Sequence, residues 1–129
     1  MITVKRLAEE VITVAALEPY RKNDQSGCSY LREDGTPNCI IGQALFNLKL
    51  LAPGFATLTY ARHVDDGHVS LNEMGIGGFL SDPSLRDLGM PNLVPDEYRY
   101  HEFLIAVQRI ADNYKPWAIA VASASRILL

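Results

Sequence analysis

The stretch CSYLREDGTPNCIIGQAL, residues 28–45, contains the change of pattern that decides the fold. Asp34-Gly35 is a strong signal for a type I′ hairpin turn, because that turn needs positive φ at both central residues and this pair tolerates it. From Cys39 onward the apolar residues follow helical spacing instead. The stretch therefore predicts a short β-hairpin over residues 28–39 that leads directly into a helix.

The turn also predicts the register of the hairpin. With Asp-Gly at the tip, Leu31 faces Asn38 and Tyr30 faces Cys39. Pro37 has no N–H for the ladder, so the hairpin should be short and lie at an edge.

The two cysteines of the chain, Cys28 and Cys39, both lie in this segment. The register places them diagonally across the hairpin, about 7 to 8 Å apart, which is more than a disulfide spans without local distortion. Two cysteines in a chain of this size suit a reducing compartment as thiols, and one disulfide stays an alternative.

The rest of the chain predicts three further helices. Apolar residues at helical spacing mark residues 4–16, a helix capped by Asp96 and an apolar segment, WAIAVASASRILL, that follows Pro116. Residues 55–94 could form a second hairpin, but a short helix or an irregular segment is favoured, followed by a long surface connection. The expected fold is a mainly helical α+β domain, a single domain over residues 1–129 with about four helices.

Composition and charge exclude several function classes. The 129 residues carry a formal net charge of −3 and no run of Lys or Arg, so we expect no nucleic-acid binding. Glu9 and Glu10 interrupt the position where a signal peptide needs its apolar run. No segment reaches the about 18 apolar residues of a membrane span. A cytoplasmic protein that does not enter membranes is therefore expected.

Three motifs together resemble a known family. They are C-x-Y followed by D-G-x-P-x-C-I-I-G-x-A-L in residues 28–45, L-x-x-V-Q at 104–108 and P-W-x-x-A-V at 116–121. This pattern resembles small uncharacterised proteins from actinobacteria and their phages, over about half of the chain, and departs from it in the longer middle section, 53–95. The resemblance implies no activity. It implies a bacterial or phage cytoplasmic setting and, for a phage protein, binding to a host protein.

Cys39 at a helix N-terminus is the best candidate for a reactive group, because the helix dipole favours a thiolate there. His63 or His68 as base and Asn72 as the residue that orients it would complete a cysteine-dependent site. However, no cysteine-protease signature surrounds Cys39, and a cysteine flanked by two isoleucines is most simply a buried packing residue.

Cys28, Cys39, His63 and His68 would form a four-ligand zinc set. Structural zinc ligands usually come in close pairs such as C-x2-C, and ten residues separate these two cysteines. We therefore expect no metal and no cofactor. His101 is expected to be a surface histidine.

The sequence is thus best interpreted as a non-enzymatic interaction protein with a protein partner, which could be a host protein. The alternatives are a thiol-dependent enzyme that uses Cys39, and a homodimeric structural protein. Exposed apolar residues of the middle connection and the last helix are the expected contact surface. A structural role is expected for Cys28, Tyr30, Asp34, Gly35, Pro37, Cys39, Gly42 and Trp117.

Overall fold

The computed structural model describes residues 1–24, 29–61 and 67–129, and within these ranges the chain is mainly helical. The α-helices are α1 (Val4–Leu17), α2 (Ile40–Asn47), α3 (Ile76–Ser81), α4 (Pro83–Gly89), α5 (Tyr98–Ala111) and α6 (Trp117–Ala124). Short strands form two pairs: β1 (Ile2–Thr3) lies parallel to β4 (Leu93–Val94), and β2 (Thr59–Ala61) lies antiparallel to β3 (His68–Ser70). The mainly helical α+β fold class is confirmed.

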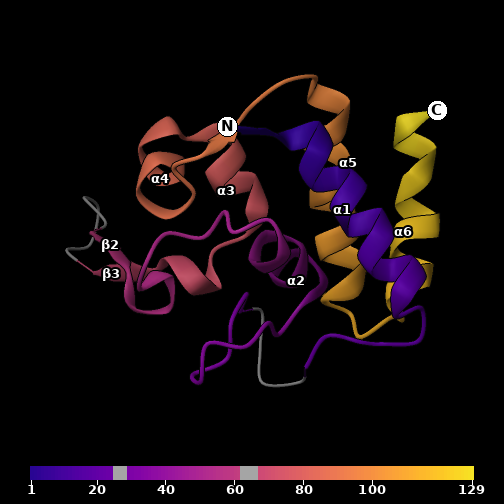
Figure 1. The fold of residues 1–129 in the computed structure, drawn as a ribbon, viewed down its shortest axis with the longest axis horizontal. Helices are drawn as coiled ribbons and strands as arrows, with labels where there is room; N and C mark the ends of the chain where they lie inside the picture. The colour runs from indigo at the N-terminus through magenta and orange to yellow at the C-terminus, as the bar shows by residue number, and fades with distance from the viewer. Residues whose placement is uncertain (25–28, 62–66) are drawn as a thin grey trace.

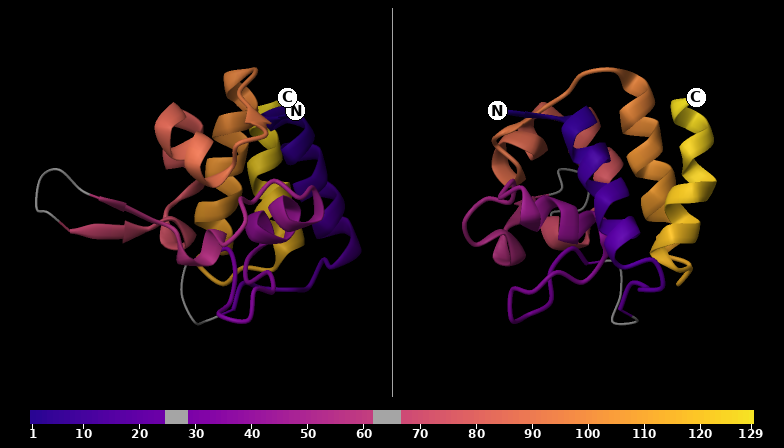
Figure 2. Two further views of the ribbon diagram at one scale, coloured as in Figure 1. Left: turned by 60° about the vertical axis from the view of Figure 1, so that its left-hand side comes forward. Right: turned by 45° about the vertical axis from the view of Figure 1, so that its right-hand side comes forward.

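Helices α1, α5 and α6 lie side by side and form one part of the molecule (Figure 1). Helix α2 packs against α1 and α5, and α3 packs between α4 and α5. The β2–β3 hairpin extends away from the helices (Figure 2). The buried apolar residues form one contiguous cluster, to which all six of these helices contribute.

Helix α1 follows its predicted apolar stripe closely. The Thr3 hydroxyl accepts a hydrogen bond from the Arg6 N–H (3.1 Å), which satisfies one of the free donors at the helix start. Five residues of the predicted stripe are buried, Val4, Leu7, Ala8, Val11 and Ala15, and Val14, which the prediction left out, is buried as well. Ile12 and Ala16, which were expected on the same inner face, are exposed at its border.

Helix α2 begins where the sequence pattern changes period. Cys39 is its N-cap, and its Sγ accepts a hydrogen bond from the Gly42 N–H (3.3 Å). The helix buries five of its eight residues, Ile40, Ile41, Gly42, Ala44 and Leu45. A helix buried on most sides contributes much of the hydrophobic stabilisation of a small domain.

The hairpin before α2 has a different turn from the predicted one. Gly35 has φ +85°, but Asp34 does not have positive φ, so the type I′ prediction is wrong. The Gly35 N–H donates to the Arg32 carbonyl (2.9 Å) and the Arg32 N–H donates to the Thr36 carbonyl (2.8 Å). This is a three-residue loop that ends in a left-handed glycine. A loop one residue longer shifts the register.

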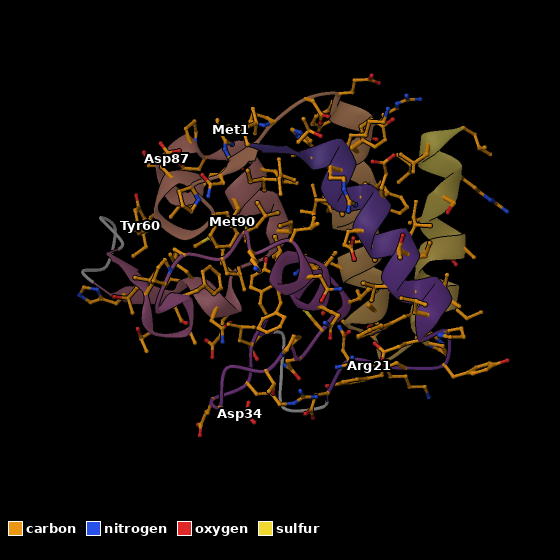
Figure 3. All side chains as sticks on the ribbon, viewed as in Figure 1. Met1, Arg21, Asp34, Tyr60, Asp87 and Met90 are labelled. Atoms are coloured by element: carbon orange, nitrogen blue, oxygen red, sulfur yellow. The ribbon has the colours of Figure 1, made fainter. Side chains whose placement is uncertain are left out.

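The shifted register leaves a single antiparallel bridge, between Leu31 and Pro37, in place of the predicted pairing of Leu31 with Asn38. Hydrogen bonds to the Asp34 carboxylate explain why the chain forms the three-residue loop. It accepts hydrogen bonds from the Thr36 N–H (3.0 Å) and the Thr36 hydroxyl (2.6 Å), and these bonds hold the loop closed. The Thr36 bonds lower the pKa of Asp34, which lies at the outer end of the loop (Figure 3).

The middle of the chain is more ordered than expected. Residues 59–61 and 68–70 pair as strands, so the favoured helix or irregular segment is wrong there. The expected surface connection contains α3 and α4, which bury Ile76, Phe79, Leu80 and Leu85. Several of its turn-forming residues stand at the ends of these helices. Gly75 precedes α3, Asp82 caps α4, and Pro83 occupies the first helical position of α4.

Within the described ranges, no helix is both long enough and apolar enough to cross a bilayer.

Candidate functional site

Cys39, the proposed nucleophile, lies in the core. Its side chain is 3% exposed and contributes to the apolar cluster. Burial in apolar surroundings disfavours a thiolate, whereas the position at a helix N-terminus favours one. The Gly42 N–H bonded to Sγ is one of the donors that the helix start leaves free, so the sulfur acts as a helix cap here.

Asn72, the proposed orienting residue, bonds to the hairpin that precedes α2 through both polar atoms of its side chain. Its side-chain Oδ1 accepts from the Leu31 N–H (2.9 Å), and its Nδ2 donates to the Leu31 carbonyl (2.8 Å). The Asn72 carbonyl also accepts from the Tyr30 N–H (3.0 Å). Asn72 thus makes the hydrogen bonds that a neighbouring β-strand would make with the backbone of Tyr30 and Leu31. These bonds hold the hairpin that precedes α2 against the rest of the domain.

The proposed histidine partners are not brought to Cys39 by the described part of the chain. His68 is exposed on β3, in the hairpin that extends from the helices. His63 and Cys28 lie outside the described residues, so half of the zinc set does as well. Among the residues that are described, no three His, Cys, Asp or Glu side chains gather as metal ligands. The absence of a bound metal stays a prediction.

Asn23 is a central residue that the sequence did not single out. Its Oδ1 accepts from the Ile40 N–H (3.1 Å) and from the Trp117 indole N–H (2.9 Å), and its Nδ2 donates to Asp112 (3.1 Å). The side chain therefore joins the starts of α2 and α6 to the end of α5. No sequence signal distinguishes it, because it stands in a polar loop, RKND, of ordinary composition.

Arg21 covers the outer side of the same junction. Its guanidinium lies 4.3 Å from the centre of the buried Trp117 ring. It donates hydrogen bonds to Gln43 (3.1 Å) and to the Pro37 carbonyl (3.3 Å). Figure 3 shows Arg21 beside the ends of α1 and α6. A cation over an indole ring contributes to stability and also fixes the loop that follows α1.

Tyr30 has a packing role at the centre of this junction, and not a catalytic one. Its ring makes edge contacts with Phe55 and Phe79, with centroids 5.8 and 6.0 Å away. Burial raises the pKa of the Tyr30 hydroxyl well above its ordinary value. The residue therefore stays neutral at physiological pH, and residues 28–45 form a structural junction between hairpin and helix as far as they are described.

A polar groove of about 650 Å³ lies beside the hairpin, and its lining includes Asp24, Arg32, Glu33, Asp34 and Glu73. Arg32 is already paired with Asp24 (3.0 Å) and donates to the Pro37 carbonyl (2.6 Å). These contacts give Arg32 and Asp24 a role in holding the loop.

The best candidate for a functional surface is the groove between α1 and α6, called here the α1–α6 groove. It has a volume of about 250 Å³ and is lined by Ile12, Ala15, Ala16, Pro19, Ala118, Val121 and Ala122. None of these residues is charged. Ile119, which is 52% exposed, follows Ala118 on α6, and Tyr20, which is 88% exposed, follows Pro19.

Backbone contacts fix the two walls of this groove relative to each other. Helices α1 and α6 lie side by side and run in opposite directions (Figure 1). The Ala118 N–H donates to the Pro19 carbonyl (3.1 Å), and the Trp117 N–H donates to the Arg21 carbonyl (2.8 Å). The inner face of α6 buries Trp117 and Ala120, so its outer face is held in place. The predicted apolar helix after Pro116 is therefore buried on one side and exposed on the other.

Comparisons with protein-family models, with curated proteins and with solved structures gave no match. Function is therefore inferred from the side chains and their arrangement alone.

Proposed function

We propose that this protein is a non-enzymatic, cytoplasmic interaction protein that binds a helical segment of a partner protein in the α1–α6 groove. The observation that supports this most is the uncharged, apolar lining of a groove that two antiparallel helices leave open to solvent. An apolar groove between two helices offers a docking surface to the apolar face of an amphipathic helix. A third helix laid between two others buries such surface in the way a helical bundle does.

The shape of the groove favours a helix as its occupant. Ala16, Ala118 and Ala122 have small side chains, which allow another helix to approach closely. Ile12, at 39% exposure, is larger and can pack against the side of that helix. Because the lining carries no charge, the contact face of the partner should be apolar, with its polar residues at the rim.

The two alternatives have less support. A thiol-dependent enzyme would need Cys39 to be accessible, and its side chain is 3% exposed. A homodimer through α6 would use the same groove, with a second copy as the occupant. The resemblance to actinophage proteins makes a protein of the host cell the first partner to examine.

The experiment uses one disruptive variant and one matched control. Ala122→Arg places a long charged side chain in the groove, and Ser84→Arg makes a similar change at an exposed position of α4. Both residues are small, helical and exposed, so both variants should fold, which circular dichroism can check. We expect the wild type and Ser84→Arg to retain the same protein from a native cytoplasmic extract, and Ala122→Arg to lose it.

Equal retention by all three proteins would overturn the proposed use of the groove. Light scattering after size-exclusion chromatography tests the occupant separately. We expect a monomer of 14.3 kDa for the wild type. A dimer that Ala122→Arg dissociates would replace the partner protein by a second copy of this chain.

A further inference from the structure

Two loops meet at one end of the α1–α6 groove, residues 18–22 after α1 and residues 112–116 before α6, and are called here the basic end. The Ala118 N–H donates to the Pro19 carbonyl (3.1 Å), which joins the chain at this point. Figure 3 shows Arg21 beside the ends of the two helices. Because Pro19 and Ala118 also line the groove, the basic end continues its surface.

The basic end carries exposed hydrogen-bond donors. Lys22 and Lys115 are exposed, and neither side chain forms an ion pair or a hydrogen bond with residues 1–24, 29–61 or 67–129. Tyr20 is 88% exposed and Tyr114 is 43% exposed. Ammonium groups donate up to three hydrogen bonds, and tyrosine hydroxyl groups donate one each. A molecule that supplies acceptor groups therefore fits this surface.

The carboxylates of the same two loops are already bonded within the chain. The Arg21 guanidinium donates to the Glu18 carboxylate (2.9 Å), and the Asn23 side-chain amide donates to Asp112 (3.1 Å). They are therefore less able to neutralise the two lysines. Although the whole chain has a net charge of −3, this end presents unpaired positive charge to an incoming molecule.

The opposite end of the groove carries one charge of each sign. Helices α1 and α6 run in opposite directions, so the start of α1 and the end of the last helix lie at the same end (Figure 1). Glu9 lies about one turn before Ile12, and Arg126 lies about one turn after Ala122. Both charged side chains are exposed. Because their charges balance, the basic end decides how a polar occupant is oriented.

A helix in the groove has such a polarity. Its last four carbonyl groups have no partner within the helix, and its C-terminal end carries a partial negative charge. Lysine side chains near that end can donate to the free carbonyls and interact favourably with the helix dipole. The N-terminal end of a helix presents free N–H groups and partial positive charge, which two unpaired lysines would repel.

We propose that the partner helix lies parallel to α1, with its C-terminal end at the basic end and an acidic side chain just beyond it. This inference rests on the proposed function of the groove. The free carbonyls and the carboxylate of the partner accept from Lys22 and Lys115, and the rings of Tyr20 and Tyr114 offer contact area beside them. The partner is thus an apolar helical segment followed by an acidic residue.

Crosslinks from two positions test the orientation. p-Benzoylphenylalanine replaces Tyr20 at the basic end or Ile12 near the opposite end, and the crosslinked peptides of the partner are identified by mass spectrometry. Tyr20 is 88% exposed and similar in shape to the replacement, so folding should be retained. We expect both crosslinks in the same partner helix, with the one from position 20 about two turns closer to its C-terminus.

Charge reversal tests the contribution of the lysines. Lys22→Glu and Lys115→Glu each reverse one charge at the basic end, and Lys49→Glu makes the same change at an exposed position outside both loops. The probe is the protein that position 12 crosslinks. At low salt, we expect each basic-end variant to bind it about twofold to fivefold more weakly than the wild type, and Lys49→Glu to bind it equally. The differences should shrink at about 0.5 M NaCl.

The outcomes separate this inference from the proposed function. Crosslinks in the reverse order, or equal binding by Lys22→Glu, Lys115→Glu and Lys49→Glu, would overturn the orientation while leaving the groove as the binding site. The absence of crosslinks from both positions 12 and 20 would overturn the proposed function and this inference with it. Crosslinks to a second copy of this chain would also overturn the inference, because the occupant would then not be a partner protein.

Discussion

Gly42→Ala is the change that tests the junction between hairpin and helix most severely. Gly42 lies in the first turn of α2, directly against the backbone of Tyr30. A Cβ at this position would lie 2.9 Å from both the carbonyl carbon and the Cα of Tyr30, and closer still to the carbonyl oxygen. The added methyl group therefore meets backbone, which cannot rotate away as a side chain can.

The hairpin has little freedom to make room. The Tyr30 carbonyl accepts from the Asn38 N–H (2.9 Å), and the Tyr30 N–H donates to the Asn72 carbonyl (3.0 Å). Overpacking a core typically costs about 1 to 3 kcal/mol, and a rigid backbone contact belongs at the upper end of that range. Alanine is a better helix former than glycine by about 1 kcal/mol, which offsets part of the cost. We expect a net loss of about 2 kcal/mol in the free energy of unfolding.

Urea unfolding followed by circular dichroism measures this loss, with Gly78→Ala as the matched control. Gly78 lies in α3, and a Cβ there would meet only the flexible side chain of Met74, at 3.0 and 3.2 Å. This variant should stay within about 1 kcal/mol of the wild type, because the side chain can move and alanine favours the helix. If Gly42→Ala were as stable as the wild type, the close packing of hairpin and helix described here would be refuted.

Three further predictions concern single residues. Gly35→Val should lower the free energy of unfolding by about 1 kcal/mol or more, because φ is +85° at this position and a β-branched residue is strained there. Crowding adds nothing to this cost, since no atom lies within 4 Å of the added Cβ, and an unchanged urea midpoint would contradict the prediction. Because the folded-state pKa of His101 is lowered, its neutral form should stabilise the protein above about pH 6.5, and this contribution should be lost as the pH falls below that unfolded-state value. Melting temperatures between pH 7.5 and 5 should therefore fall more steeply for the wild type than for His101→Phe, and parallel curves would argue against a lowered pKa. Iodoacetamide should modify Cys39 much more slowly in the native protein than in urea, as judged by peptide mass spectrometry, because its side chain is buried. Native labelling faster than that of a small-molecule thiol would instead favour the thiol-dependent enzyme.

Helical periodicity was the most reliable part of the sequence analysis. The helices at 4–17, 40–47, 98–111 and 117–124 were all expected within a few residues, except that the last one ends earlier, before a turn of 3-10 helix (Ser125–Leu128). The predicted cap of the third helix was wrong: Glu97 precedes that helix, and the Asp96 carboxylate accepts from the Lys5 N–H instead (3.2 Å). Their apolar faces are regular, and periodicity depends only on local sequence. The position of Cys39 at the start of a helix followed from the same change of period.

The predictions that failed depended on contacts between distant residues or on competing local bonds. The Asp34-Gly35 pair was compatible with two loops, and the Thr36 hydroxyl, bonded to the Asp34 carboxylate, stabilises the longer one. His101 is exposed if its helix is considered alone, and becomes buried only because α3 covers it. Helix α3 was not predicted, because it lies in a glycine-rich stretch that composition alone assigns to a loop.

The candidate surfaces were only partly visible in the sequence. Exposed apolar residues in the last helix were expected, and Ile119 and Ala122 are such residues. The contribution of α1 to the groove was missed, because Ile12 and Ala16 continue the apolar stripe of that helix and were therefore expected to be buried. Asn23 could not have been recognised, since its three partners lie 17, 89 and 94 residues away in the chain.

Site-specific photocrosslinking tests the central proposal, that the α1–α6 groove holds a partner helix, most directly. p-Benzoylphenylalanine is introduced in place of Ala122, in the groove, or in place of Ser84, on exposed α4, and cells that contain either protein are irradiated. We predict one crosslinked protein species from position 122, with the crosslink in a helix of the partner, and no such species from position 84. The same products from both positions, or none from position 122, would contradict the proposed function.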